Sequence, residues 1–130
     1  MMRKAPNDAL TAAQLNVMEA LWACGPDGGY AYDIWQQAGG EDAVARTTIL
    51  TVIQRLEERG WIRRSGSGRK LRYHATRNRE ETLEHLSNRF VRDYFGGSAS
   101  QLVMSLLGSE KLDETEIRQL RTLLDAQEDV

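Results

Sequence analysis

The sequence has one cysteine, two histidines and two prolines among 130 residues, and it has no long apolar run. The single cysteine, Cys24, excludes an intrachain disulfide framework. A transmembrane helix needs roughly 20 predominantly apolar residues in a row, so no membrane insertion is expected. Residues 1–6 lack the apolar core of a signal peptide, which favours a cytoplasmic location. At this length, one buried core or a compact head with a helical appendage is expected.

Motifs of catalysis and metal binding are also missing. His74 and His85 have no HExxH or CxxC pattern near them, and the chain has no glycine-rich phosphate loop. Cys24 follows Trp22-Ala23, a setting typical of a core thiol, and a role as a redox trigger would require a low thiol pKa. We therefore expect no enzymatic activity, no metal and no cofactor.

Basic and acidic residues nearly balance over the whole chain, but they are unevenly distributed along it. The net charge is −2, yet residues 42–79 hold ten basic and three acidic groups, a net charge of +7. Residues 1–41 carry −3 and residues 80–130 carry −6. Affinity for nucleic acid depends on such a local patch rather than on the total. The alternative is an ordinary solvated basic face, which is less favoured because the charges coincide with the helix and hairpin described next.

The clearest pattern lies between residues 46 and 75. Ile49, Val52, Ile53 and Leu56 recur at helical spacing and predict one apolar face on a helix that ends near Arg59. Gly60 stops this helix, and two strands are predicted at 61–65 and 69–75 around a Ser/Gly turn. A helix, a glycine stop and a basic hairpin in this order predict a winged helix-turn-helix.

Further helices are predicted on both sides of this segment. One covers residues 10–24 with Thr11 as N-cap and an apolar stripe of Leu15, Met18, Leu21 and Trp22; a shorter one covers residues 30–38. Three amphipathic helices follow from Asn78, the second capped by Ser98 and the third by Asp113. The fold class is therefore mainly α, with an α+β winged helix-turn-helix head at residues 1–77 and a helical dimerisation region at residues 78–130.

The apolar faces of the last three helices have little intrachain core left to cover, so we expect them to meet a second copy of the chain. The alternative is that they fold back on their own head. The residues expected at the dimer interface are Phe90, Tyr94, Phe95, Leu102, Val103, Leu106, Leu107, Ile117, Leu120 and Leu124.

Short residue groups occur in a characteristic order along most of the chain. They are Leu10-Thr11, Val17-Met18-Glu19-Ala20-Leu21-Trp22, Gly25-Pro26, Asp33-Ile34, Thr48-Ile49 with Thr51, Ile53, Arg55-Leu56 and Arg59-Gly60, Gly68-Arg69 with Tyr73, Phe95-Gly96-Gly97-Ser98 with Leu102-Val103, and the helix from Glu116 to Leu124. On these residues the chain resembles the penicillinase-repressor family of bacterial transcription regulators, the BlaI/MecI/CopY type.

This resemblance implies a homodimer whose winged heads lie in successive major grooves of a double-stranded DNA operator and block transcription. In the family's known systems, release follows cleavage by a membrane-bound sensor metalloprotease, which makes such a protease a candidate partner, or copper loading in a cysteine-bearing branch. The family's Asn-Phe cleavage pair is replaced here by Ser105-Leu106, and residues 126–130 contain no cysteine for copper. Leu50 stands where many members have a basic or glutamine side chain, so a different operator sequence is expected.

The residues expected to contact DNA lie on the polar side of the helix and at the wing. Leu50 is available for a thymine methyl group, while the polar side chains reach phosphates and base edges. The expected contacts are Arg46, Thr47, Thr48, Leu50, Thr51, Gln54 and Arg55 on the helix, and Arg69 and Lys70 at the wing tip. Alternatively, Arg55 pairs with Glu58 or Glu19, and Thr47 and Thr51 are ordinary surface residues.

Two other functions stay open for this fold. A winged-helix regulator that responds to a small ligand would need a pocket, which one sequence cannot show. A winged-helix protein-interaction module would need no DNA, because fold alone does not determine function. The +7 segment favours DNA binding over the interaction module, because a scaffold has no need to concentrate arginine on a helix and a hairpin together.

Overall fold

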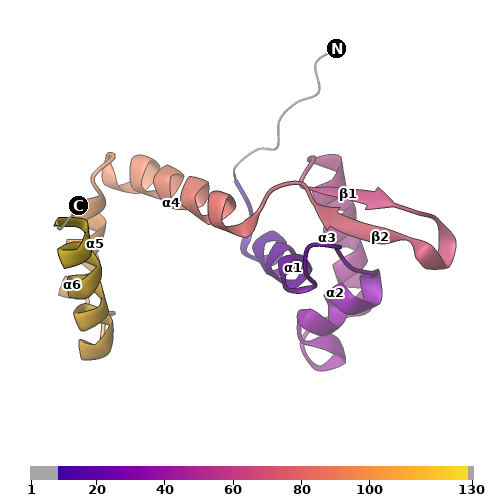
Figure 1. Cartoon of the computed structure of the whole chain (residues 1–130), viewed down its shortest axis with the longest axis horizontal. Helices are drawn as coiled ribbons and strands as arrows, with labels where there is room; N and C mark the ends of the chain where they lie inside the picture. The colour runs from indigo at the N-terminus through magenta and orange to yellow at the C-terminus, as the bar shows by residue number, and fades with distance from the viewer. Residues whose placement is uncertain (1–8, 129–130) are drawn as a thin grey trace, which may run out of the picture. The chain divides into compact units, whose positions relative to one another are not determined.

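The computed structural model describes residues 9–128, and none of the helices in that range is both long and apolar enough to span a bilayer. Figure 1 shows three helices, a hairpin and three further helices in chain order. The elements are α1 (Ala12–Ala23), α2 (Ala31–Gln37), the 3-10 helix η1 (Gly40–Asp42), α3 (Arg46–Glu58), β1 (Ile62–Ser65), the 3-10 helix η2 (Gly68–Lys70), β2 (Arg72–Ala75), α4 (Arg79–Phe95), α5 (Ala99–Gly108) and α6 (Glu114–Glu128).

The chain forms two compact units, and the boundary between them falls inside α4, between Leu86 and Ser87. The first unit contains the three helices and the hairpin of a winged helix-turn-helix, as predicted. The second contains the end of α4 with α5 and α6. The division predicted at residue 77, between a DNA-binding and a dimerisation domain, stays a prediction. The boundary between compact units does not show which residues bind DNA and which form a dimer.

The core of the first unit is built from α1, α2, α3 and the hairpin. Met18, Ile34 and Leu56 have no exposed surface, and Trp61 is 1 % exposed. The smaller buried side chains include Val17 and Ala20 of α1, which the predicted stripe omitted, whereas Leu15 and Trp22 are only half-buried. The stripe prediction was therefore wrong at its edges, and Trp22 shows why. Its indole nitrogen donates to the Arg77 carbonyl at 2.9 Å, which holds the ring at the rim of the core.

The helix caps follow local sequence. Thr11 forms a capping box with Gln14: the Gln14 backbone N–H donates to Thr11 Oγ1 at 3.1 Å, and the Thr11 N–H donates to Gln14 Oε1 at 3.0 Å. Ser98 caps α5 by accepting from the Gln101 N–H at 3.2 Å. Asp113 accepts from the Glu116 N–H at 2.8 Å at the start of α6. These predicted caps are confirmed.

The hairpin is antiparallel, with Arg63 opposite His74 and Arg64 opposite Tyr73. Its second strand begins at Arg72 and not at residue 69 as predicted, because residues 68–70 turn as the 3-10 helix η2. The loop after α1 lies beside β2, where Gly29 and Tyr73 exchange backbone hydrogen bonds of 3.0 and 2.8 Å. Gly28 allows this approach: its φ is +74°, and a Cβ there would lie 2.2 Å from the Tyr73 carbonyl oxygen.

We predict that Leu56→Ala lowers the free energy of unfolding by about 2–5 kcal/mol, because it leaves a cavity in the core between α3 and its neighbours. Leu50→Ala is the matched control on the same helix: Leu50 is 40 % exposed, and we expect a change within about 0.5 kcal/mol. Urea unfolding followed by circular dichroism measures both. Equal losses for the two variants would contradict the assignment of the buried face.

Candidate nucleic-acid interface

Helix α3 has one buried and one exposed side. Ile49, Ile53 and Leu56 are at most 3 % exposed and face the core. The seven residues predicted to contact DNA from this helix are all exposed: Arg46, Thr47, Thr48, Leu50, Thr51, Gln54 and Arg55. Helical geometry thus brings the predicted contacts together on the side that faces solvent.

The polar side chains on this surface differ in what they offer a ligand. The Thr51 hydroxyl donates to the Thr47 carbonyl at 3.0 Å, so Thr51 presents its lone pairs outward and acts as an acceptor. Thr47 and Gln54 make no side-chain hydrogen bond to a described residue, which leaves their donors and acceptors available. Leu50 adds an apolar contact at the centre of the surface.

Arg55 has no ion pair or hydrogen bond within residues 9–128, so neither alternative partner is used. Glu19 pairs instead with Arg79, at 2.9 Å from Nε to Oε2. The guanidinium of Arg55 therefore stands on the exposed side of α3 with its five donors unspent among the described residues. Planar guanidinium groups of this kind suit phosphate oxygens and the acceptor edge of guanine.

The N-terminus of α3 is open to an anion. Its N-cap is Ala45, whose side chain cannot accept a hydrogen bond, and its first turn holds no acidic residue. The first backbone N–H groups of a helix carry the positive end of the helix dipole. In α3 the Thr48 N–H donates to the Ala45 carbonyl at 3.1 Å, which leaves the N–H groups of Arg46 and Thr47 for an anion. Arg46 and Thr48 lie in this first turn and are exposed. The arrangement fits a phosphate group.

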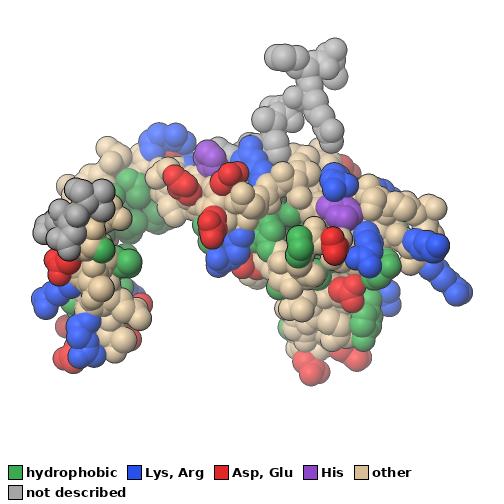
Figure 2. Space-filling view, in the orientation of Figure 1, with side chains coloured by type: hydrophobic (Ala, Val, Ile, Leu, Met, Phe, Trp, Pro, Cys, Tyr) green, Lys and Arg blue, Asp and Glu red, His purple; other side chains and the backbone are tan. Residues whose placement is uncertain are grey.

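The hairpin tip carries the remaining predicted contacts. Arg69 and Lys70 lie in η2, and both are exposed. Their side chains make no hydrogen bond or ion pair to a described residue. Figure 2 shows Lys and Arg side chains at the far end of the hairpin. The sequence prediction missed Arg63 as a candidate, although it is exposed on β1 and likewise unpaired among the described residues.

Several other arginines of the +7 segment are occupied within the fold. Arg64 donates twice to the Glu57 carboxylate of α3, each time at 2.7 Å, and this carboxylate raises the pKa of Arg64 above its usual range. The Arg72 guanidinium lies 4.4 Å from the centre of the Tyr30 ring. Arg59 Nη1 donates to Gln14 Oε1 at 2.8 Å, which joins the end of α3 to α1. Fewer basic side chains are thus available to a partner than the sequence count indicates.

The pKa values of Cys24 and His74 are each shifted in the direction that favours the uncharged form. Burial raises the pKa of Cys24, and the Asp33 carboxylate raises it further, so the thiolate needed for a redox trigger is disfavoured. Burial lowers the pKa of His74, and the neighbouring Arg63 and Arg72 lower it too. No group of three or more His, Cys, Asp or Glu side chains between residues 9 and 128 is arranged to hold a metal ion.

Comparison with known proteins finds relatives that match most of the chain. The methicillin resistance regulatory protein MecI of Staphylococcus aureus is 24% identical over 116 residues, which are 89% of this chain and 93% of that protein. The penicillinase repressor of Bacillus licheniformis is 23% identical over 124 residues, 95% of this chain and 94% of the relative. A solved structure from a study of how 6-hydroxynicotinic acid regulates DNA binding by Bordetella bronchiseptica BpsR is 26% identical, with a TM-score of 0.47, and covers 97% of this chain and 80% of that one. A family model described as penicillinase repressor matches residues 10–126, and the chain therefore belongs to the penicillinase repressor family.

Proposed function

We propose that this protein is a sequence-specific DNA-binding repressor that acts in the cytoplasm and binds a palindromic operator as a homodimer. The observation that carries the proposal is the exposed side of α3, where Arg55 is unpaired among the described residues and the N-terminus has no side-chain cap. Membership of a repressor family supports repression over activation.

Each part of the surface has a distinct role in this proposal. Thr47, Thr51, Gln54 and Arg55 reach base edges in the major groove, and Leu50 contacts a thymine methyl group. Arg46, Thr48 and the first N–H groups of α3 bind phosphate and set the register. Arg69 and Lys70 lie over the adjacent minor groove or its phosphates. A protein-interaction module is disfavoured because it gives no reason to leave these cations unpaired on one helix and one hairpin tip.

The second unit supplies the surface for a homodimer. Among residues 99–127 none is buried, and Tyr94 of α4 is 74 % exposed. Leu123 and Leu124 are each 63 % exposed, and Met104 is 69 % exposed; Met104 and Leu123 extend the predicted set. A surface of this kind is typical of a protein–protein contact. We infer that a second copy covers it and sets the heads about 34 Å apart, or a multiple of that distance, to match the DNA helical repeat.

The predicted dimer residues differ in exposure. Those that are exposed within a single chain are Phe90, Tyr94, Val103, Leu107, Leu120 and Leu124, and those that are half-buried are Phe95, Leu102, Leu106 and Ile117. The half-buried group packs within its own chain, so substitutions there would disturb the monomer as well as the dimer. The exposed group therefore gives the cleaner test of dimerisation.

The function is tested by fluorescence anisotropy with DNA from upstream of the protein's own gene, against a shuffled duplex, at two salt concentrations. We expect a preference of about 10³-fold or more for the native fragment. If about 6–10 phosphates are neutralised, affinity should fall by roughly 10³–10⁵ between 50 and 200 mM salt. Equally weak binding to both duplexes, with little effect of salt, would contradict DNA binding by this head.

Arg55→Ala and Lys70→Ala separate base recognition from phosphate contact. We predict that Arg55→Ala costs about 1–3 kcal/mol on the native fragment and relaxes the preference over the shuffled duplex. Lys70→Ala should weaken binding to both duplexes alike and reduce the salt slope by about 1. The same anisotropy titrations measure both effects. An unchanged preference in Arg55→Ala would show that this side of α3 does not face the bases.

Leu124→Asp tests the homodimer. A carboxylate on this exposed apolar surface should be tolerated in a monomer but not in a dry interface, because burying an unpaired charge is costly. We predict a monomer by light scattering and weaker binding to the native fragment. Gln119→Asp on the same helix is the control, and it should stay dimeric. Retention of the dimer by Leu124→Asp, with unchanged helicity, would place the interface elsewhere.

A further inference from the structure

The head contains an open groove of about 370 Å³ between the end of α1, the loop after it and the base of the hairpin. Its apolar side is formed by Leu21, Trp22 and Pro26. Its polar side includes Arg63 and His74 on the hairpin and Asn78 at the start of α4. None of the lining residues is acidic, and none belongs to α3. The groove is therefore a second surface of the head, separate from the proposed DNA contacts of that helix.

Three polar groups of the groove have hydrogen-bonding capacity that the described residues do not use. The Arg63 guanidinium has no ion pair or hydrogen bond among them. Asn78 accepts from the Glu81 N–H through Oδ1 at 2.8 Å, which leaves its amide nitrogen as a donor. His74 uses Nε2 toward the Ser65 hydroxyl at 2.7 Å, which leaves Nδ1. Such groups on one concave surface are the usual way in which a pocket fixes the orientation of a ligand.

Arg63 and Arg77 supply the positive charge among the residues that line the groove, and the Arg77 guanidinium lies 5.2 Å from the centre of the Trp61 ring. Arg63 lies directly opposite His74 in the hairpin register, and its charge helps to lower the pKa of that histidine. The Asp27 carboxylate acts on the pKa of His74 in the opposite direction, but more weakly than Arg63. Asp27 does not line the groove. The lining thus holds two guanidinium groups and no acidic residue, which favours an anion over a cation.

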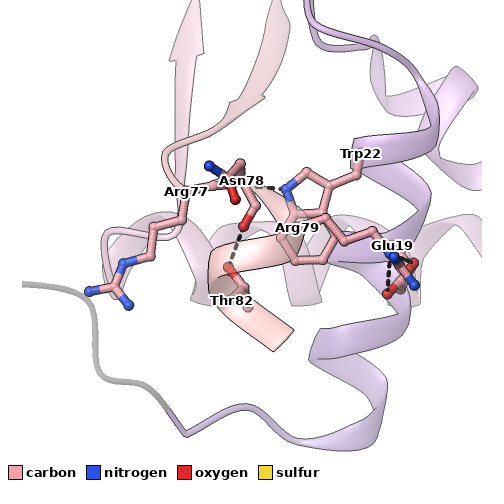
Figure 3. A network of polar contacts seen from close by, with 6 residues as sticks. All are labelled: Glu19, Trp22, Arg77, Asn78, Arg79 and Thr82. Atoms are coloured by element: carbon pink, nitrogen blue, oxygen red, sulfur yellow. Dashed lines mark hydrogen bonds and ion pairs between the residues drawn. The ribbon is translucent and has the colours of Figure 1, made fainter. Parts of the chain in front are cut away.

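The wall next to α4 is held in place by the contacts drawn in Figure 3. The Trp22 indole donates to the Arg77 carbonyl at 2.9 Å, and the hydroxyl of the fully buried Thr82 donates to the Asn78 carbonyl at 2.8 Å. Arg79 Nε lies 2.9 Å from Glu19 Oε2 of α1. Because these bonds lie within the chain itself, binding would spend little free energy on ordering the wall.

We propose that this groove binds a small organic carboxylate, with its carboxylate on Arg63 and Asn78 and its apolar body against Leu21, Trp22 and Pro26. A guanidinium and an amide N–H match the planar oxygens of a carboxylate. The apolar side distinguishes this ligand from an inorganic anion, which would gain nothing from contact with Trp22. The volume lies within the range of about 300–1,000 Å³ for small-molecule sites.

The test uses the ¹⁵N-labelled full chain without DNA, so its result is independent of the proposed repressor function. Sodium benzoate and inorganic phosphate are titrated separately at constant ionic strength, and the tryptophan indole N–H signals are followed by NMR. Trp22→Phe identifies the signal of Trp22. Trp35, whose indole donates to the Val44 carbonyl at 2.8 Å and which does not line the groove, is the internal control.

We expect benzoate to shift the Trp22 signal to saturation while the Trp35 signal stays in place. Arg63→Gln should weaken benzoate binding by about tenfold or more, because it removes a charge-assisted hydrogen bond. Arg69→Gln removes the same charge from the same hairpin outside the groove and should change affinity by less than about twofold. Absence of a saturable Trp22 shift, or equal losses in the two variants, would overturn the proposal. A shift by phosphate as strong as that by benzoate would overturn it too, because the site would then select charge alone.

Discussion

The burial of Ile49, Ile53 and Leu56 determines which side of α3 faces solvent, and the proposed DNA contacts depend on it. Because a helix repeats every 3.6 residues, three buried positions fix the direction of all the others. Glu57 of the same helix pairs with Arg64 of β1, so the orientation of the hairpin is tied to that of α3. Helix α3 and the hairpin that carries the proposed wing contacts are therefore held together within the head.

The basic residues of the head fall into two groups. Arg55, Arg69 and Lys70 have side chains without a partner among the described residues, and the other group makes contacts within the chain. Arg59, Arg64, Arg72 and Arg79 bind carboxylates, carbonyls or an aromatic ring within the chain and hold its elements together. Arginine suits both uses because its fork of donors can bridge two elements as well as bind phosphate. The charge count of residues 42–79 does not separate these two groups, so it exceeds the number of basic side chains that are available to a partner.

Features that depend on neighbouring residues could be predicted from the sequence, and features that depend on distant ones could not. The caps at Thr11, Ser98 and Asp113 and the buried side of α3 follow from spacings of three or four residues. The pairing of Glu19 with Arg79 joins positions 60 residues apart, and no local pattern indicates it. The start of β2 at Arg72 was missed because the turn does not end with the predicted Ser/Gly segment but continues through η2 to Lys70.

The groove between α1 and the hairpin bears on how such a repressor would leave DNA. In the family's known systems release follows cleavage of an Asn-Phe pair, and Ser105-Leu106 stands at those positions here. A redox trigger at Cys24 is disfavoured because burial raises the pKa of its thiol. A bound carboxylate would need neither covalent step. It would bridge Arg63 of the hairpin and Asn78, the cap of α4, and so restrain the wing against the start of that helix. The hairpin position with carboxylate bound can differ from the position that fits DNA. The ligand then shifts the equilibrium between these two positions by the difference in its binding free energy for them.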